Sequence, residues 1–293
     1  MKKRFFLKFA SLLVLSVCLF CGCRGGGESQ SDTDAEAQSE FVLPEISDGT
    51  DIFHRGFGEN EKFVVVIDAG HQREGMYSYE PIGPNSEQTK IQVADGTQGR
   101  ITNIPEYELN LSVSLALRDE LLRRGYTVVM VRETHDVKIS NMQRALLANG
   151  YEPSEQNGYA HTVNIRIHAN ASEDESARGA LVCHPSFFNP YPIRELYDEC
   201  RALSKSVLEA YSEESGIPIF SNGYLPTDEM TGTNFCEIPT TILEMGFMSN
   251  SEDDNIMASD EFKLAAARGI SNGLEQYFDK YTGDDSAADC DTE

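Results

Sequence analysis

Residues 63–71 read Phe63-Val64-Val65-Val66-Ile67-Asp68-Ala69-Gly70-His71 and decide the fold of this 293-residue chain. A short run of β-branched residues that ends at a glycine is typical of a buried strand that stops at a loop. The residue after that glycine is His71, an imidazole at the end of the predicted strand. A histidine in this position is more often a hydrogen-bonded loop residue than a metal ligand. Its role therefore depends on which other side chains reach the same edge of the sheet.

The rest of the chain predicts strands that alternate with helices. Further strands are expected at 126–131, 161–168, 179–184, 217–220 and 240–244. Helices are expected to follow Pro105, over 139–149 and 193–211, from about Ser251, and over 260–278. This alternation predicts an α/β fold: a single domain with a twisted, mostly parallel sheet and helices on both faces. In such sheets, sites lie beyond the carboxyl ends of the strands.

The segment between the first strand and the first helix, residues 72–105, is polar and has no sustained period of 2 or 3.6 residues. A loop this long inside a compact domain is usually functional or disordered. Because it begins directly after His71, we expect it to form one wall of a substrate groove.

The ends of the chain differ in composition from the middle. Residues 1–22 have a basic start and an apolar stretch typical of a signal peptide. Gly22-Cys23 resembles the lipidation site of bacterial lipoproteins, which predicts a lipid anchor on Cys23 at the outer face of the cell membrane. The alternative is ordinary cleavage and secretion. We expect residues 23–60 to be a flexible acidic and Gly/Ser-rich spacer, 61–280 the folded catalytic domain and 281–293 a disordered acidic tail.

Charge and cysteine content exclude some functions. With 48 acidic and 24 basic residues, the chain has a formal net charge of −24, so nucleic acid and anionic membrane surfaces are poor partners. Four cysteines lie beyond the signal peptide without CxxC spacing, which argues against a structural zinc knot. Sequence leaves the disulfide state of these four open: Cys183, Cys200, Cys236 and Cys290.

Three polar side chains, His71, His168 and Glu244, each end a separate apolar strand. A fourth, Glu106 or Glu108, lies in the first turn of the helix after the long loop, where the helix dipole alone would favour a carboxylate. Two histidines and a carboxylate form the ligand set of many hydrolytic zinc sites, and a further carboxylate can serve as general base.

Four separated motifs, spread over residues 63–278, resemble those of the zinc-dependent N-acetylmuramoyl-L-alanine amidases, which hydrolyse the bacterial cell wall. They are Val66 to His71, Glu106 to Leu111, Ile165 to Asn170 and Pro239 to Asn250. The resemblance implies that Zn²⁺ is held by His71, Glu106 and His168, and that Glu244 is the catalytic carboxylate. It also implies the reaction: hydrolysis of the amide bond between the lactyl group of N-acetylmuramic acid and L-alanine in peptidoglycan, by water that the zinc activates.

Departures from the family motifs bear on substrate preference. Gln72-Arg73 follow the first histidine where the family usually has Gly-Gly, and Arg166 replaces a serine. We expect these changes near the mouth of the site. Asp68 is expected to cap the loop or to orient a ligand. Four residues have either a substrate-binding or a structural role: Asn110, Arg144, Asn170 and Asn250.

Two other functions remain open at this stage. One is a wall-binding lipoprotein that keeps the fold without turnover, and the other is a zinc peptidase that cuts within the stem peptide. In each case we expect an extracytoplasmic monomer that contacts peptidoglycan.

Overall fold

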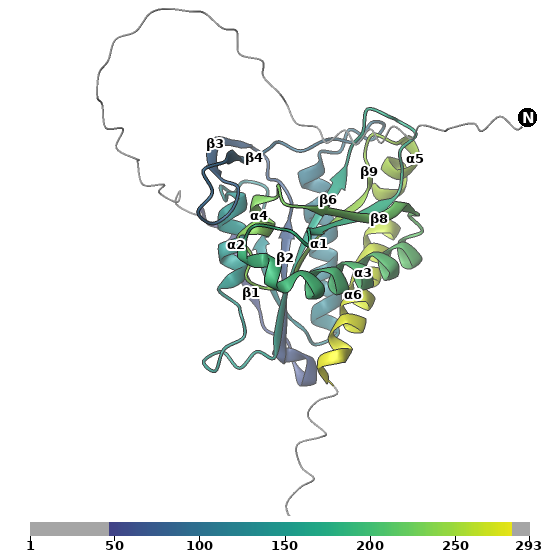
Figure 1. Cartoon of the computed structure of the whole chain (residues 1–293). Coiled ribbons are helices and arrows are strands. Elements are labelled where there is room, and N and C mark those ends of the chain that lie inside the picture. Colours follow the sequence, from purple (N-terminus) through teal and green to yellow (C-terminus); the bar gives the residue numbers. More distant parts are fainter. Residues whose placement is uncertain (1–46, 283–293) are drawn as a thin grey trace, which may run out of the picture.

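The computed structural model describes residues 47–282 and builds them around one seven-stranded sheet (Figure 1). The strand order is β1-β5-β2-β6-β9-β7-β8. The strands are β1 (Thr50–His54), β2 (Phe63–Ala69), β5 (Thr127–Arg132), β6 (His161–Asn170), β7 (Ala180–Pro185), β8 (Ile219–Thr227) and β9 (Thr240–Phe247). The four central strands run parallel, which confirms the predicted α/β class.

Helices cover both faces of the sheet (Figure 1). On one face, α1 (Glu106–Arg123), α3 (Tyr197–Ser215) and α6 (Asp260–Thr282) share one apolar core with Phe63, Val65 and Ile67 of β2. On the other, α2 (Asn141–Asn149) and the 3-10 turn η2 (Pro192–Leu196) pack against Val64 and Val66. The apolar run of β2 is buried on both sides, as a central parallel strand requires.

The remaining helical segments are short. They are η1 (Gly58–Lys62), α4 (Thr231–Asn234) and α5 (Ser251–Met257). Within the described residues, no helix is long and apolar enough to span a membrane.

The folded region begins before residue 61, which corrects the predicted spacer boundary. Residues 50–54 form β1, an edge strand that pairs antiparallel with β5. Its side chains alternate between half-buried and exposed, so it lacks the continuous apolar run that identifies central strands. Helix α6 likewise continues to Thr282, past the predicted start of the tail. The other predictions for the termini, including the signal peptide and Cys23, lie outside the described residues.

Two further features differ from the sequence prediction. The segment 72–105 contains an antiparallel hairpin, β3 (Met76–Pro81) and β4 (Thr89–Val93), where we expected a loop without regular structure. Strand β7 runs antiparallel to β9, so the sheet reverses direction at its far edge. Cys183, Cys200 and Cys236 are buried and free, and Cys290 lies outside the described residues.

Candidate metal centre

Three predicted ligands from separate elements meet at the carboxyl edge of the central strands. His71 follows β2, Glu106 opens α1 and His168 lies near the end of β6, and one ligand atom from each lies within 4.8 Å of the others. Glu106 Oε1 is 3.3 Å from both His71 Nε2 and His168 Nδ1. Ligand atoms bound at about 2.0–2.2 Å to one tetrahedral zinc ion lie about 3.3–3.6 Å apart. The spacing therefore fits a shared metal ion.

His71 is held by its backbone and by one ring nitrogen. Its φ of +57° lies in the left-handed region, which turns the chain sharply after Gly70. Its Nδ1 lies 2.8 Å from the carbonyl oxygen of Ala94. Donation of the Nδ1 proton to this carbonyl leaves the Nε2 lone pair facing Glu106, which is the tautomer that metal binding requires.

Glu106 is buried and held by groups from three segments. Its Oε1 accepts hydrogen bonds from the Ala169 amide and from Asn110 Nδ2, each at 3.2 Å, and its Oε2 accepts one from the Thr97 amide at 3.0 Å. Burial opposes ionisation, but His71 and His168 outweigh it and hold the pKa of Glu106 well below its ordinary value. The side chain is therefore ionised and held in one orientation, as a metal ligand needs to be. Asn110, whose role was open, positions this carboxylate and also contacts the Gly70 carbonyl.

The His168 ring lies directly over Gly70. A Cβ atom at that glycine would come within 2.3 Å of the imidazole, so only glycine leaves room for the ring. Burial lowers the pKa of His168 to about 4, which keeps the imidazole neutral and able to bind a metal. Its Nε2 atom is buried and has no hydrogen-bond partner among the described residues.

Glu244 lies beside this cluster on the neighbouring strand. Its Cα pairs in register with His168 across β6 and β9. Burial, followed by the negative charge of Glu106, raises the pKa of Glu244 to about 8. A carboxylate with a raised pKa can take up and release a proton near neutral pH. The four residues predicted from the motifs are thus brought together at one edge of the sheet.

Beneath the site lies a buried charge network around Asp68. This carboxylate accepts hydrogen bonds from Arg144 Nη1 at 2.5 Å and from Arg166 Nε at 2.8 Å. Burial disfavours its ionised form, but the two arginines hold the pKa of Asp68 well below its ordinary value. Arg144 also donates to the His71 carbonyl at 3.1 Å. We call residues 69–71 the ligand loop. Asp68 acts on this loop through Arg144 and does not cap it directly.

A third buried arginine, Arg132, was not identified from the sequence. It ends the apolar strand β5 and donates to the carbonyls of Ala69 and Gly70 at 2.8 and 3.0 Å. Burial lowers its pKa to about 9. The sequence did contain a signal for this role: Arg132 is the last residue of an apolar strand. A charge in that position is buried and therefore needs hydrogen-bond acceptors nearby.

The structure corrects the expected position of two departures from the family motifs. Arg166 and Gln72 are buried beneath the ligand loop and do not lie at the mouth of the site. Arg166 pairs with Asp68, and Gln72 Oε1 accepts a hydrogen bond from Arg144. Both belong to the support of the ligand loop.

The end of the long segment wraps over two of the ligands. We call residues 94–97 the strap: the Ala94 carbonyl contacts His71, and the Thr97 amide contacts Glu106. Gly96 has a φ of +86°, and a Cβ there would lie 2.9 Å from Glu106 Oε2. Sequence reasoning expected a groove wall here and missed that the segment positions the ligands.

Asn250 caps helix α5. Its Oδ1 accepts hydrogen bonds from the amides of Glu252 and Asp253. Of the two roles left open for Asn250, these contacts show the structural one. The Asn170 side chain accepts a hydrogen bond from the Ala171 amide at 2.8 Å, at the end of β6.

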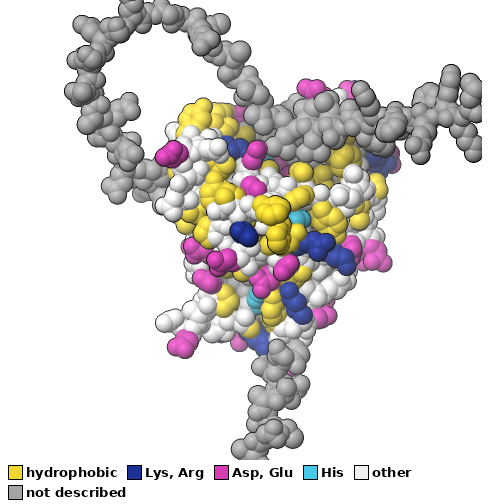
Figure 2. Space-filling view, in the orientation of Figure 1, with side chains coloured by type: hydrophobic (Ala, Val, Ile, Leu, Met, Phe, Trp, Pro, Cys, Tyr) yellow, Lys and Arg dark blue, Asp and Glu magenta, His cyan; other side chains and the backbone are white. Residues whose placement is uncertain are grey.

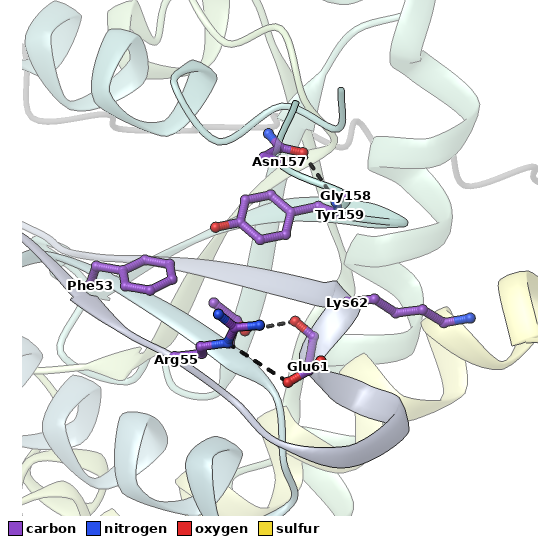
Figure 3. Close-up of a pocket in the computed structure, with 8 residues that line it drawn as sticks. Phe53, Arg55, Glu61, Lys62, Asn157, Gly158 and Tyr159 are labelled. Carbon is purple, nitrogen blue, oxygen red and sulfur yellow. Dashed lines mark hydrogen bonds and ion pairs between the residues drawn. The ribbon is translucent and has the colours of Figure 1, made fainter. Parts of the chain in front are cut away.

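A small cavity of about 140 Å³ lies at the opposite end of the strands (Figure 3). Its lining includes Phe53, Tyr159 and an Arg55–Glu61 ion pair with an N–O distance of 3.8 Å. Lys62 and Thr127, which also line it, stand at the amino ends of β2 and β5. The cavity is thus separate from the ligand cluster.

Two imidazoles, a buried carboxylate and a neighbouring proton acceptor at a sheet edge fit the site of a metal-dependent hydrolase. Comparison with known families agrees. The model of the N-acetylmuramoyl-L-alanine amidase family matches residues 65–276, and the chain belongs to this family.

Solved structures show the same fold. The amidase Ami1 from Mycobacterium smegmatis superposes with a TM-score of 0.64 at 23% identity, covering 74% of this chain and 97% of that one. An N-acetylmuramoyl-L-alanine amidase from Clostridium difficile 630 gives a TM-score of 0.55 at 21% identity, covering 74% and 97%. Among curated proteins, the uncharacterized YqiI of Bacillus subtilis (strain 168) is 25% identical over 175 residues, or 60% of this chain and 75% of that protein.

Proposed function

We propose that this amidase hydrolyses the amide bond between the lactyl group of N-acetylmuramic acid and L-alanine in peptidoglycan, with Zn²⁺ held by His71, Glu106 and His168. The observation that carries the proposal is the pair of 3.3 Å distances from Glu106 Oε1 to the two imidazoles, with Glu244 in register beside them.

The donor set supports zinc over other ions. Imidazole nitrogen and carboxylate oxygen are common zinc ligands, and three of them leave a position for water or substrate. One candidate ligand atom from each of the three side chains lies within 4.8 Å of the others, which supports a shared ion. When bound, zinc would lower the pKa of water and polarise the scissile carbonyl.

Glu244 would carry the proton. It takes one from the attacking water and delivers it to the nitrogen of the departing L-alanine, so that the amide C–N bond breaks to give a carboxylate and a free amine. The in-register pairing of Glu244 with His168, which places it beside the candidate ligands, supports this role. Asn110 and the strap keep the Glu106 carboxylate oriented, which holds the ligand geometry during the reaction.

The experiment compares wild type with Glu244→Gln on purified sacculi. Loss of the general base is expected to lower release of free stem peptides by about 10²- to 10⁴-fold. Equal release by both proteins would refute the role of Glu244 and favour a contaminating activity. Fragments that lack N-terminal L-alanine would identify a peptidase within the stem, and wall binding without release by wild type would identify a non-catalytic lipoprotein.

We further propose that Cys23 carries a lipid anchor and that the enzyme works as a monomer outside the cell, on wall close to the membrane. The Gly22-Cys23 motif after an apolar stretch supports the anchor. A Cys23→Ala variant is expected to leave the membrane fraction for the soluble extracytoplasmic fraction. Unchanged membrane association would refute the anchor, and a sedimentation mass of two chains would refute the monomer.

A further inference from the structure

The hairpin of β3 and β4 is tied to the metal centre at its base. Asp95, in the strap, accepts hydrogen bonds from the Tyr77 hydroxyl at 2.5 Å and from the Gly75 amide at 3.1 Å. The carbonyl oxygen of the preceding residue, Ala94, lies 2.8 Å from His71 Nδ1. Tyr77 is therefore bonded to the strap residue next to the one that contacts His71, which places the base of the hairpin beside the candidate metal centre.

A β-bulge turns two tyrosines of β3 outward. Met76 pairs with Val93 and Tyr79 with Ile91, so three steps along β3 oppose two along β4. Tyr77, Ser78 and Tyr79 are consecutively exposed, and alternation resumes only at the buried Glu80. Tyr77 and Tyr79 are 61% and 64% exposed. Figure 2 shows hydrophobic side chains gathered at the upper left, over β3 and β4. The core does not use these rings.

We propose that Tyr77 and Tyr79 stack against sugar rings of the glycan strand next to the scissile bond; this rests on the proposed function. A tyrosine ring offers a flat apolar face and carries its polar hydroxyl at the edge, which suits a sugar that is apolar on its ring faces and polar at its rim. Tyr77 and Tyr79 lie two residues apart on β3 and are both exposed, so one polymer can contact both rings. The amide-linked lactyl group is borne by such a sugar, so the neighbouring sugars must pass close to the metal centre.

The charge of this surface favours a neutral glycan over a phosphate-bearing polymer. The sequence around the two tyrosines has three exposed carboxylates and two exposed cations. The carboxylates belong to Glu74, Glu87 and Asp95, and the cations to Arg73 and Lys90. The formal net charge of the whole chain is −24. An anionic polymer would be repelled at this surface, whereas uncharged sugars would not be.

The binding test uses naked glycan strands from which the stem peptides have been removed, in a Glu244→Gln background that prevents turnover. Tyr79→Ala is expected to weaken binding about three- to tenfold, because one stacked ring is lost. Tyr79→Phe keeps the ring and should bind as the parent does. Phe57→Ala is the matched control, since Phe57 is 62% exposed and its amide bonds to Gly125 at the amino end of β5. Equal binding by Tyr79→Ala and its parent would overturn the proposal.

The kinetic test uses Tyr79→Ala in the otherwise unaltered enzyme. KM for sacculi should rise three- to tenfold with kcat nearly constant, and a substrate with a single sugar should be cleaved with less change. An equal rise in KM for the single-sugar substrate would assign the tyrosines to the stem peptide and overturn the glycan proposal. Full activity of Glu244→Gln would refute the proposed mechanism separately, because glycan binding is measured without turnover.

Discussion

At the scale of single residues, the ligand loop depends on charges that lie beneath it. Asp68 balances Arg144 and Arg166, and Arg144 together with Arg132 donates hydrogen bonds to the carbonyls of residues 69–71. Motif recognition identified His71 and His168 because their chemistry is carried by the side chain itself. It left Asp68 ambiguous, because its partners are 76 and 98 residues away along the chain.

Asp68→Asn should therefore be strongly destabilising. Removing the carboxylate leaves buried guanidinium groups without a counter-charge, which costs about 3–5 kcal/mol of unfolding free energy. Urea denaturation measures the change. The control is Asp260→Asn, which breaks an exposed pair with Lys263 and should leave the free energy of unfolding nearly unchanged. A loss below about 1 kcal/mol for Asp68→Asn would show that the network does not need this charge.

At the scale of elements, the β3–β4 hairpin is fastened to the start of helix α2. The buried Glu80 carboxylate accepts the Met142 amide at 3.2 Å, and Asn141 Nδ2 donates to the Gln92 carbonyl at 2.7 Å. Burial raises the pKa of Glu80 to about 7, against weaker opposing effects of Ser140, the Met142 amide, Arg166 and Arg144. The hairpin thus carries a carboxyl group that the fold prefers to keep protonated.

The pH dependence of stability follows from the sign of this shift. Because the folded state binds the Glu80 proton more tightly than the unfolded state, this group favours folding less as the pH rises from about 4.5 to 7. Glu80→Gln keeps an acceptor oxygen but cannot become charged. Its stability relative to wild type should therefore increase as the pH rises, by on the order of 1–3 kcal/mol at pH 8. Denaturation at pH 5 and pH 8 gives the difference, and a difference that does not change with pH would contradict the assignment.

At the scale of the whole molecule, the candidate metal centre connects β2, α1, β6 and the strap. Glu106 Oε1 lies 3.3 Å from each of the two histidines, so an ion bound by all three would link these distant segments more firmly. A bound ion that prefers the folded state should stabilise the entire domain.

Chelation should therefore lower the Tm of the wild-type protein, and zinc should restore it. A metal held at about 100 times its Kd contributes about 2.7 kcal/mol. His168→Ala should lose stoichiometric zinc and show no response to either treatment. His54→Ala, which alters a histidine at the edge strand β1, should behave as wild type. One retained zinc per chain in His168→Ala would remove that residue from the ligand set.

What the sequence determined by itself was the set of elements whose signal is local. A continuous apolar run predicts β2, because this strand is buried on both faces. A stripe of apolar residues predicts the helix that follows the long loop, because this helix buries one face. The class of fold and the four site residues followed from these strands and from the family motifs at their ends.

What only the tertiary structure decided were the pairings between distant segments. Four features have no local signal in the sequence. They are the edge strand β1, the antiparallel direction of β7, the strap over His71 and Glu106, and the arginine contacts around Asp68. Their positions depend on which buried polar groups the sheet brings into contact, and burial requires each of those groups to find a partner there.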